Sequence, residues 1–232
     1  LRDHLGDLAW FGTLPNADTI EIGHLLRHRA GLPDHVHRRE FQAALHVFTD
    51  DTAFHADRLV AFVSGLDPLF DAGTAYAYSD TGYVLLGLVI EQATGRPWRD
   101  VVSERFLAPL ELEDTVASDR ADIPGLAVGY TSPDNQFGLS ARTADQEGRL
   151  LWNPAVESAG GGFASTSADL ARWGRALFTG EAMDNAYLDR LLQGAPVTAD
   201  APDALYAAVV SIRVETPCGR IWGHGGWIPG FV

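Results

Sequence analysis

A group of polar side chains precedes one long apolar segment and could take part in proton transfer. Tyr76, Tyr78, Ser79, Asp80 and Thr81 lie in the stretch YAYSDT, and an apolar, helix-like run follows them directly. Ser79 or Asp80 would accept a hydrogen bond from the first free N–H groups of such a helix and so cap it. A cap leaves Tyr78 without a role. A phenol at a buried helix start can carry a proton if cationic neighbours lower its pKa, so Tyr78 is a candidate catalytic residue.

Four histidines near the start of the chain offer a different chemistry. His24 and His28 are four residues apart on an expected helix, and His35 and His37 follow in a loop. Imidazoles at this spacing can bind zinc, but Leu25 stands where a zinc-protease helix carries its glutamate. Two interpretations stay open: a zinc site, or a helix-end His28 that hydrogen-bonds nearby backbone beside solvated loop histidines. We favour the second, which needs no metal.

Other residues of reactive or ligand-binding type lack the surroundings they would need. The glycines at 160–162 are not followed by the lysine of a phosphate-binding loop, so a tight turn or close backbone packing is expected there. No Gly-x-Ser-x-Gly nucleophile elbow occurs. Cys218, the single cysteine, has no histidine beside it and is expected in a turn with Pro217 and Gly219. No motif indicates a cofactor.

Charge and hydropathy exclude two further classes of function. The formal net charge is −14, and all 17 basic residues are arginine, so the chain contains no lysine. Nucleic-acid binding is not expected, because a basic face supplies most of the affinity for phosphates. The longest apolar run, YVLLGLVI, is far shorter than the roughly 18 residues of a membrane-spanning helix. We expect an acidic globular protein without a transmembrane segment.

The elements that must position the candidate residues are mostly helical. Apolar periodicity and capping residues predict helices, with Thr19 and Ser167 as the first and last caps, at 19–31, 52–64, 81–94, 98–107 and 167–180. Strands are predicted at 126–131, 205–215 and 219–226, with a turn at 217–219.

These elements predict an α+β fold in a single domain over 1–232. A mainly helical region at 20–180 packs beside a mainly antiparallel sheet at 205–232. A lone hairpin is marginal, so the sheet is expected to be incomplete within this chain.

Four segments carry a pattern in a fixed order. They are HLLRHRAGLPDH at 24–35, the long segment at 78–115, SAGGGFASTSADLARWGRAL at 158–177 and GHGGWIPGF at 223–231. Together they resemble the serine β-lactamase-like hydrolases, which include class C β-lactamases, D-Ala-D-Ala carboxypeptidases, D-aminopeptidases and related esterases. The segment at 78–115 is the most specific: Tyr-Ser-polar, Gly-Tyr, an apolar helix, Thr-Gly, and Pro-Leu close to Asp-Thr. The resemblance covers nearly the whole chain.

The resemblance implies an α+β fold of the β-lactamase/transpeptidase type and a site built from three motifs. The second family motif is Tyr-x-Asn, matched by Tyr78-Ser79-Asp80 with Asp in place of Asn. The third is Lys-Thr-Gly or His-x-Gly, matched by His224-Gly225-Gly226. The first, Ser-x-x-Lys, cannot occur in a chain without lysine.

In the family, that first motif lies upstream of the region found here at 24–31. We therefore expect the nucleophilic serine and its lysine before Leu1, and the last strand and helix of the fold after Val232. The apolar ending GWIPGFV agrees with an internal fragment of a longer protein. Family members are often exported, which implies a periplasmic or extracellular location.

The implied reaction is acyl transfer. A serine outside this chain would attack an ester or small amide and form an acyl-enzyme. Tyr78 would relay the proton, with its pKa lowered by the missing lysine. The backbone N–H groups of the nucleophile and of Trp227 would hold the oxyanion beside Gly225 and Gly226. The fragment alone is expected to be inactive.

Two departures from the family pattern bear on the substrate. His224 replaces a lysine, and a histidine is only partly charged near neutral pH. Asp80 adds negative charge where the family often has a neutral amide. Both favour a neutral ester, small amide or peptide substrate over an anionic β-lactam. The alternatives are D-Ala-D-Ala carboxypeptidase or β-lactamase activity, and a non-catalytic binding module of the same fold.

Overall fold

The computed structural model describes most of the chain, namely residues 1–45, 55–135, 137–198, 201–207, 210–213 and 216–232. The helix predicted at 52–64 lies partly outside this range; its described part contains α4, Ala56–Ala61. Gly65 follows with a φ of 74°, so the predicted glycine stop is present. Within the described residues, no helix combines the length and the apolar character needed to cross a bilayer.

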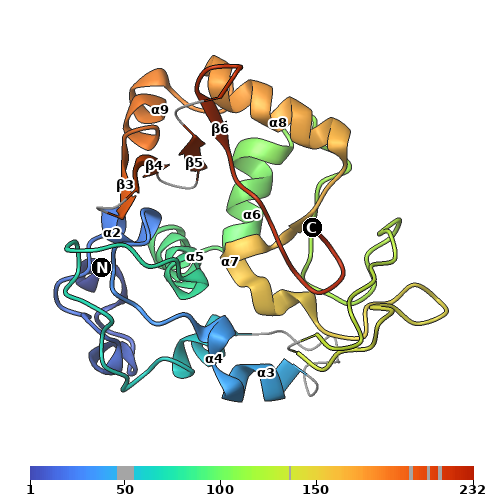
Figure 1. Ribbon diagram of the computed structural model, residues 1–232, viewed down its shortest axis with the longest axis horizontal. Helices are drawn as coiled ribbons and strands as arrows, with labels where there is room; N and C mark the ends of the chain where they lie inside the picture. Colours follow the sequence, from blue (N-terminus) through green and yellow to red (C-terminus); the bar gives the residue numbers. More distant parts are fainter. Residues whose placement is uncertain (46–54, 136, 199–200, 208–209, 214–215) are drawn as a thin grey trace.

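The fold is organised around helix α5, Asp80–Thr94, which lies near the centre of the molecule (Figure 1). It begins after Ser79 and ends at Gly95, whose φ of 66° is left-handed and suits a glycine. Val84 and Leu85 on this helix are completely buried, as its apolar sequence predicts. The helices packed against α5 are α1 (Arg2–Leu5), α2 (Ile22–Leu26), α4, α6 (Trp98–Val102) and α7 (Ser158–Gly161).

Of the remaining helical segments, η2 (His35–His37) also contacts α5 through the hydrogen bonds of His35 to Thr81. α6 continues into a π-helical turn, η3 (Ser103–Leu107), so the helix predicted at 98–107 is present with a change of winding. The α8 cap is Thr166, whose Oγ1 accepts the N–H of Asp169, and not the predicted Ser167. The other bounds are η1 (Phe11–Thr13), η2 (His35–His37), α3 (Arg39–Leu45), η4 (Pro154–Glu157), α8 (Ser167–Thr179) and α9 (Asn185–Leu191).

The first predicted helix is much shorter than the sequence suggests. It spans only α2, and Glu21 caps it in a reciprocal pair with His24, while Thr19 donates to a carbonyl of the preceding turn. The chain leaves the helix because His28 has a φ of 51° and places its ring among polar partners. Side-chain hydrogen bonds therefore end this helix before the predicted Gly31.

The main sheet, within the described residues, is antiparallel with the order β3-β4-β5-β6, and it stands beside α8 and α9 (Figure 1). The single strand predicted at 205–215 is wrong: Leu205 pairs with Ile212, so this segment folds back as two strands. The turn predicted at 217–219 is present, since the Gly219 N–H donates to Thr216 O. The bounds are β3 (Gly194–Thr198), β4 (Ala201–Ala207), β5 (Val210–Arg213) and β6 (Ile221–Gly223).

A second, two-stranded sheet pairs β1 (Val116–Ala117) with β2 (Phe163–Ala164). The strand predicted at 126–131 is reduced to one isolated bridge between Tyr130 and Arg142. Close packing predicted for the glycines at 160–162 is confirmed at Gly162, where a Cβ would lie 2.3 Å from a backbone oxygen. A helical region beside antiparallel strands confirms the α+β class.

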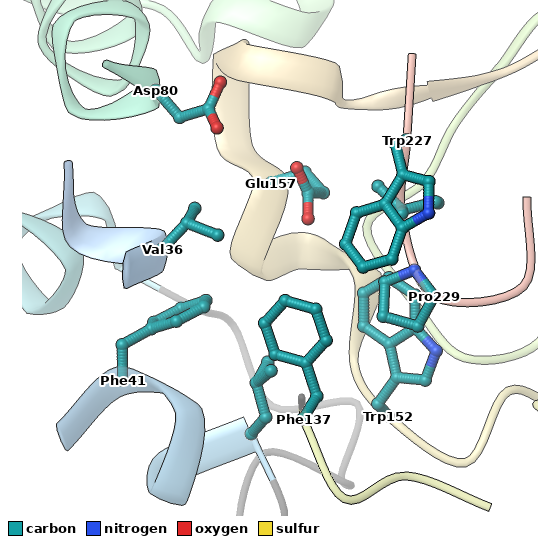
Figure 2. Close-up of a pocket in the computed structure, with 10 residues that line it drawn as sticks. Val36, Phe41, Asp80, Phe137, Trp152, Glu157, Trp227 and Pro229 are labelled. Carbon is teal, nitrogen blue, oxygen red and sulfur yellow. The ribbon is translucent and has the colours of Figure 1, made fainter. Parts of the chain in front are cut away.

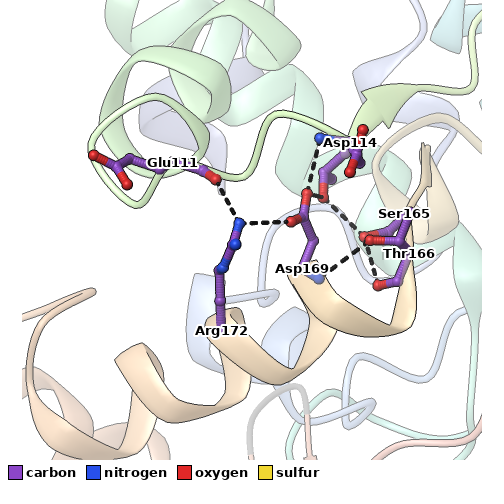
Figure 3. Close-up of polar contacts among 7 residues, drawn as sticks. Glu111, Asp114, Ser165, Thr166, Asp169 and Arg172 are labelled. Atoms are coloured by element: carbon purple, nitrogen blue, oxygen red, sulfur yellow. Dashed lines mark hydrogen bonds and ion pairs between the residues drawn. The ribbon is translucent and has the colours of Figure 1, made fainter.

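A buried carboxylate, Asp169, fastens the start of α8 to the loop that follows η3 (Figure 3). Its side chain is 1% exposed. Oδ2 accepts the Asp114 N–H at 3.0 Å and the Thr115 hydroxyl at 2.9 Å. Oδ1 pairs with Arg172 Nη1 at 3.3 Å, and that guanidinium also donates to a carbonyl of the loop. Every side of this carboxylate therefore meets a donor.

Candidate active site

Tyr78 lies in an aromatic cluster around His28. The two rings are 4.1 Å apart between centroids and inclined by 31°. The rings of Tyr76, Tyr83 and Tyr206 also lie within 6.0 Å of the imidazole. The helix start is buried as predicted at Ser79 and Thr81, whereas the Tyr78 side chain is 42% exposed.

His28 joins the start of α5 to strand β4. The Ser79 N–H donates to Nδ1 at 3.2 Å, so the neutral ring carries its proton on Nε2 and donates it to the Tyr206 hydroxyl at 3.0 Å. Burial and the nearby His224 lower the pKa of His28 to about 4, so the ring is neutral at pH 7. The interpretation of His28 as a helix-end histidine bonded to backbone is confirmed.

Asp80, the first residue of α5, meets a second carboxylate from the loop before η2. The Asp80 N–H donates to the Asp34 carboxylate, which therefore supplies the cap predicted from Ser79 or Asp80. Ser79 occupies the cap position, but its Oγ donates instead to Pro33 O at 3.2 Å. Burial, followed by the charge of Asp34, raises the pKa of Asp80 to about 6.

The environment of Tyr78 is acidic. Its hydroxyl donates to the Asp80 carboxylate. Burial, and then Asp80 and Asp34, raise the pKa of Tyr78. This direction is opposite to the lowered pKa that a phenolate requires, because burial and the neighbouring carboxylates both disfavour the charged form. Within this chain, Tyr78 is a hydrogen-bonded phenol.

His224 reaches the same place from the end of β6. Its ring centroid lies 6.0 Å from those of Tyr78 and Tyr206. Gly225 and Gly226 follow on the surface, and a Cβ added to either would meet no atom within 4 Å. The structure thus brings together the predicted residues of the second and third motifs. The packing around Gly225 and Gly226 would also accept a larger side chain at either position.

A cavity lies beside this cluster, and Asp80 and Trp227 are among the residues that line it (Figure 2). It has a free volume of about 370 Å³, part of which is open to solvent. Trp227 stacks on Phe137 with ring centroids 5.5 Å apart, and its side chain is 53% exposed. Further walls are apolar: Val36, Phe41, Trp152 and Pro229. The cavity is therefore apolar with an acidic side.

Glu157, at the end of η4, supplies the second carboxylate of the cavity (Figure 2). Burial, followed by the charges of Asp80 and Asp34, raises the pKa of Glu157 to about 8. Perturbed carboxylates that share a cavity are typical of functional sites.

The zinc interpretation finds no support in the histidine contacts. His24 Nδ1 accepts the Glu21 N–H at 3.2 Å, and His35 Nδ1 lies 3.0 Å from Thr81 Oγ1. Both nitrogens of His28 are also engaged. Among the described residues, no group of three or more His, Cys, Asp or Glu side chains is placed to hold a metal ion.

Comparison with known proteins assigns the family. The Beta-lactamase family model matches residues 3–232. The chain belongs to the β-lactamase family.

The relatives and solved structures that resemble this β-lactamase-family chain include amide-cleaving proteins. It is 30% identical to penicillin-binding protein 4 of Amycolatopsis lactamdurans over 90% of its own length and 50% of that protein's. It superposes on a D-stereospecific amidohydrolase from Streptomyces sp. with a TM-score of 0.82, at 26% identity, covering 99% of this chain and 67% of the other.

A third similar protein is the D-amino acid amidase of Ochrobactrum anthropi SV3, with a TM-score of 0.73 and 26% identity over 95% of this chain and 61% of that one. The chain spans half of the penicillin-binding protein 4 of Amycolatopsis lactamdurans and 47% of penicillin-binding protein 4* of Bacillus subtilis.

Sequence reasoning missed several residues of this site. Asp34 lies within the segment at 24–35 that carries the family resemblance, and Glu157 directly precedes the segment at 158–177. The position of Glu157 beside the glycines at 160–162 could have identified it as a candidate site residue. Tyr206 gave no signal, because an aromatic residue on an alternating strand is typical of ordinary packing.

Proposed function

We propose that this chain is part of a serine hydrolase that cleaves a small amide or an ester through an acyl-enzyme. The nucleophile belongs to a Ser-x-x-Lys segment outside the 232 residues, which contain no lysine. The supporting observation is the convergence of Tyr78 and His224 beside a cavity that Asp80 and Trp227 line.

In the first step, the serine oxygen attacks the substrate carbonyl, and the serine proton is transferred to the Tyr78 oxygen. The Tyr78 hydroxyl is the relay: its own proton is hydrogen-bonded to Asp80, so it can pass a proton on while accepting another. A lysine from the missing segment would lower the pKa of Tyr78, which the carboxylates of this chain raise. The leaving amine or alcohol takes the proton, and water then releases the acid.

The oxyanion would be held by two backbone N–H groups, that of the nucleophile and that of Trp227 in the loop after β6. Loss of one such donor costs roughly 3–4 kcal/mol in other hydrolases. The open surroundings of Gly225 and Gly226 leave room for substrate backbone at this loop.

The acidic surroundings support a substrate without a negative charge near the scissile bond. An anionic β-lactam or a free C-terminal carboxylate would face Asp80 and Glu157 instead of the lysine of the usual third motif. The likeness to a D-amino acid amidase and a D-stereospecific amidohydrolase supports amides first and esters second. D-Ala-D-Ala carboxypeptidase activity is the second candidate, supported by the likeness to penicillin-binding protein 4.

The test uses the longer natural protein that includes the Ser-x-x-Lys segment. We expect it to hydrolyse an amino acid amide and a p-nitrophenyl ester faster than a chromogenic cephalosporin, with Tyr78→Phe slowing both at least 100-fold. The 232-residue chain alone is expected to be inactive. Faster cephalosporin turnover would contradict the substrate assignment. A folded full-length protein without a serine-dependent acyl-enzyme would instead favour a non-catalytic binding module.

A further inference from the structure

The cavity contains a carboxylate without a partner. Glu157 points into it in Figure 2, and no hydrogen bond or ion pair engages its side chain within the described part of the chain. An unpaired carboxylate that is shielded from water is unfavourable unless a ligand or a proton compensates it.

The surrounding charges do not supply that compensation. Asp80 lines the same cavity, and Asp34 adds its charge to both other acids. His37 lowers the pKa of both Asp34 and Asp80, but it does not line the cavity. Among the residues that the structure describes, no arginine or histidine forms part of the cavity wall. The described wall of the cavity therefore holds two acids, Asp80 and Glu157, without a basic partner.

The opposite walls are aromatic. Trp227, Phe137, Phe41 and Trp152 line the cavity and face the acids across it (Figure 2). Aromatic faces attract ammonium groups through the ring quadrupole. Carboxylates on one side and aromatic rings on the other together make a site suited to an organic cation.

We propose that this cavity binds the ammonium group of a substrate with a free amine close to its scissile carbonyl, held between Glu157, Asp80 and Trp227. The proposal rests on the proposed function and names its substrate class: an amide or ester of an unblocked amino acid. The short separation follows from Asp80, which lines the cavity and also accepts the hydrogen bond of Tyr78. The ammonium and the proton relay are thus linked through one carboxylate.

The first experiment measures binding to the folded chain without any reaction. The probes are 2-phenylethylammonium, the neutral 2-phenylethanol and the anion 3-phenylpropionate, followed by the fluorescence of the cavity tryptophans. We expect the cation to bind at least tenfold more tightly than the alcohol, and Glu157→Gln to abolish that difference. Glu113→Gln, the same change at an exposed site, should preserve it. Equal affinity of wild type for cation and alcohol would overturn the proposal.

A second readout distinguishes a binding role from a structural one. Glu157, facing Asp80 and Asp34, is mostly protonated near pH 7 and should ionise beside a bound cation. Calorimetric binding enthalpies of 2-phenylethylammonium should therefore differ between buffers of different ionisation enthalpy, and this difference should vanish in Glu157→Gln. An unchanged difference in that variant would assign the proton release elsewhere and overturn the proposal.

The third experiment separates this inference from the proposed function. The full-length protein is given phenylalanine p-nitroanilide and its N-acetyl derivative. We expect at least a 50-fold preference for the free amine in kcat/KM, reduced to less than fivefold in Glu157→Gln. Hydrolysis of both compounds at equal rates would overturn the inference while the hydrolase stands. Selective cation binding without hydrolysis of either would support the cavity assignment and count against the proposed function.

Discussion

Glu157 precedes β2 in the sequence and Asp169 follows it. Both carboxyl groups are shielded from water, yet their surroundings differ. Asp169 meets a backbone N–H, a hydroxyl and a guanidinium. Glu157 meets a cavity and two other carboxylates, and burial and those charges raise its pKa to about 8. A carboxylate with a complete set of donors fixes the fold, whereas one left without donors at a cavity is available for a ligand.

The largest expected effect is at the donor-rich carboxylate. Asp169→Ala should lower the free energy of unfolding by about 3 kcal/mol, because it leaves the Asp114 N–H, the Thr115 hydroxyl and Arg172 without their partner. Urea unfolding followed by circular dichroism measures it. A loss below about 1 kcal/mol would mean that water replaces this carboxylate easily and would weaken the comparison.

The second effect concerns pH at Glu157. Its pKa is raised from 4.5 to about 8 on folding, so the folded state holds the proton more tightly and stability is lost as pH rises between these values. The free energy of unfolding of Glu157→Gln, relative to that of wild type, should therefore rise by about 2 kcal/mol from pH 5 to pH 8. This figure allows for the partial exposure of the side chain.

Unfolding midpoints of both proteins across this range provide the check on Glu157. Glu113→Gln, with the same charge change on the surface, should run parallel to wild type. A constant offset between Glu157→Gln and wild type at every pH would show that Glu157 does not titrate in this window.

A smaller effect is expected from one donor of the Asp169 group. Thr115→Val removes a hydroxyl that donates at 2.9 Å, and should destabilise the protein by about 1 kcal/mol. Ser165→Ala serves as the matched control, because that hydroxyl contacts Thr115 Oγ1 but not the carboxylate. If both variants lower the free energy of unfolding by the same amount, the hydrogen bond from Thr115 to Asp169 is worth no more than the contact between Ser165 and Thr115.

The smallest effect on stability is expected at the loop after β6. Gly226→Ala places a methyl group where no atom lies within 4 Å, so unfolding should change by less than about 0.5 kcal/mol. If substrate backbone passes this loop, kcat/KM of the full-length protein for an amino acid amide should fall at least tenfold. Unchanged kinetics would show that substrate does not approach the glycine.

Patterns of single segments predicted the positions of α2, α4, α5, α6 and α8, but not those of α1, α3, α7 and α9. The apolar run after Ser79 and its glycine stop fix α5 to within one residue. Prediction failed where distant contacts decide: α2 ends early because His28 bonds to Ser79 and Tyr206, and the segment at 205–215 folds back on itself. Neither partner of His28 is a neighbour in sequence.

The site was predictable as a list of motif residues and not as an electrostatic environment. The convergence of Tyr78 and His224 agrees with the family motifs. Burial, and then Asp80 and Asp34, raise the pKa of Tyr78 within this chain, which the sequence does not reveal. The lowering expected from a lysine outside the chain stays a prediction. The catalytic roles of Tyr78, Asp80 and His224 stay predictions.

The hydrogen bond between His28 and Tyr206 has an evolutionary consequence. One imidazole serves two distant segments, with Ser79 on one nitrogen and the β4 phenol on the other. Loss of Tyr206 would leave the buried Nε2–H of His28 without its acceptor, and loss of His28 would remove the acceptor of the Ser79 N–H. In related sequences, positions 28 and 206 are therefore expected to change together, although neither touches the cavity.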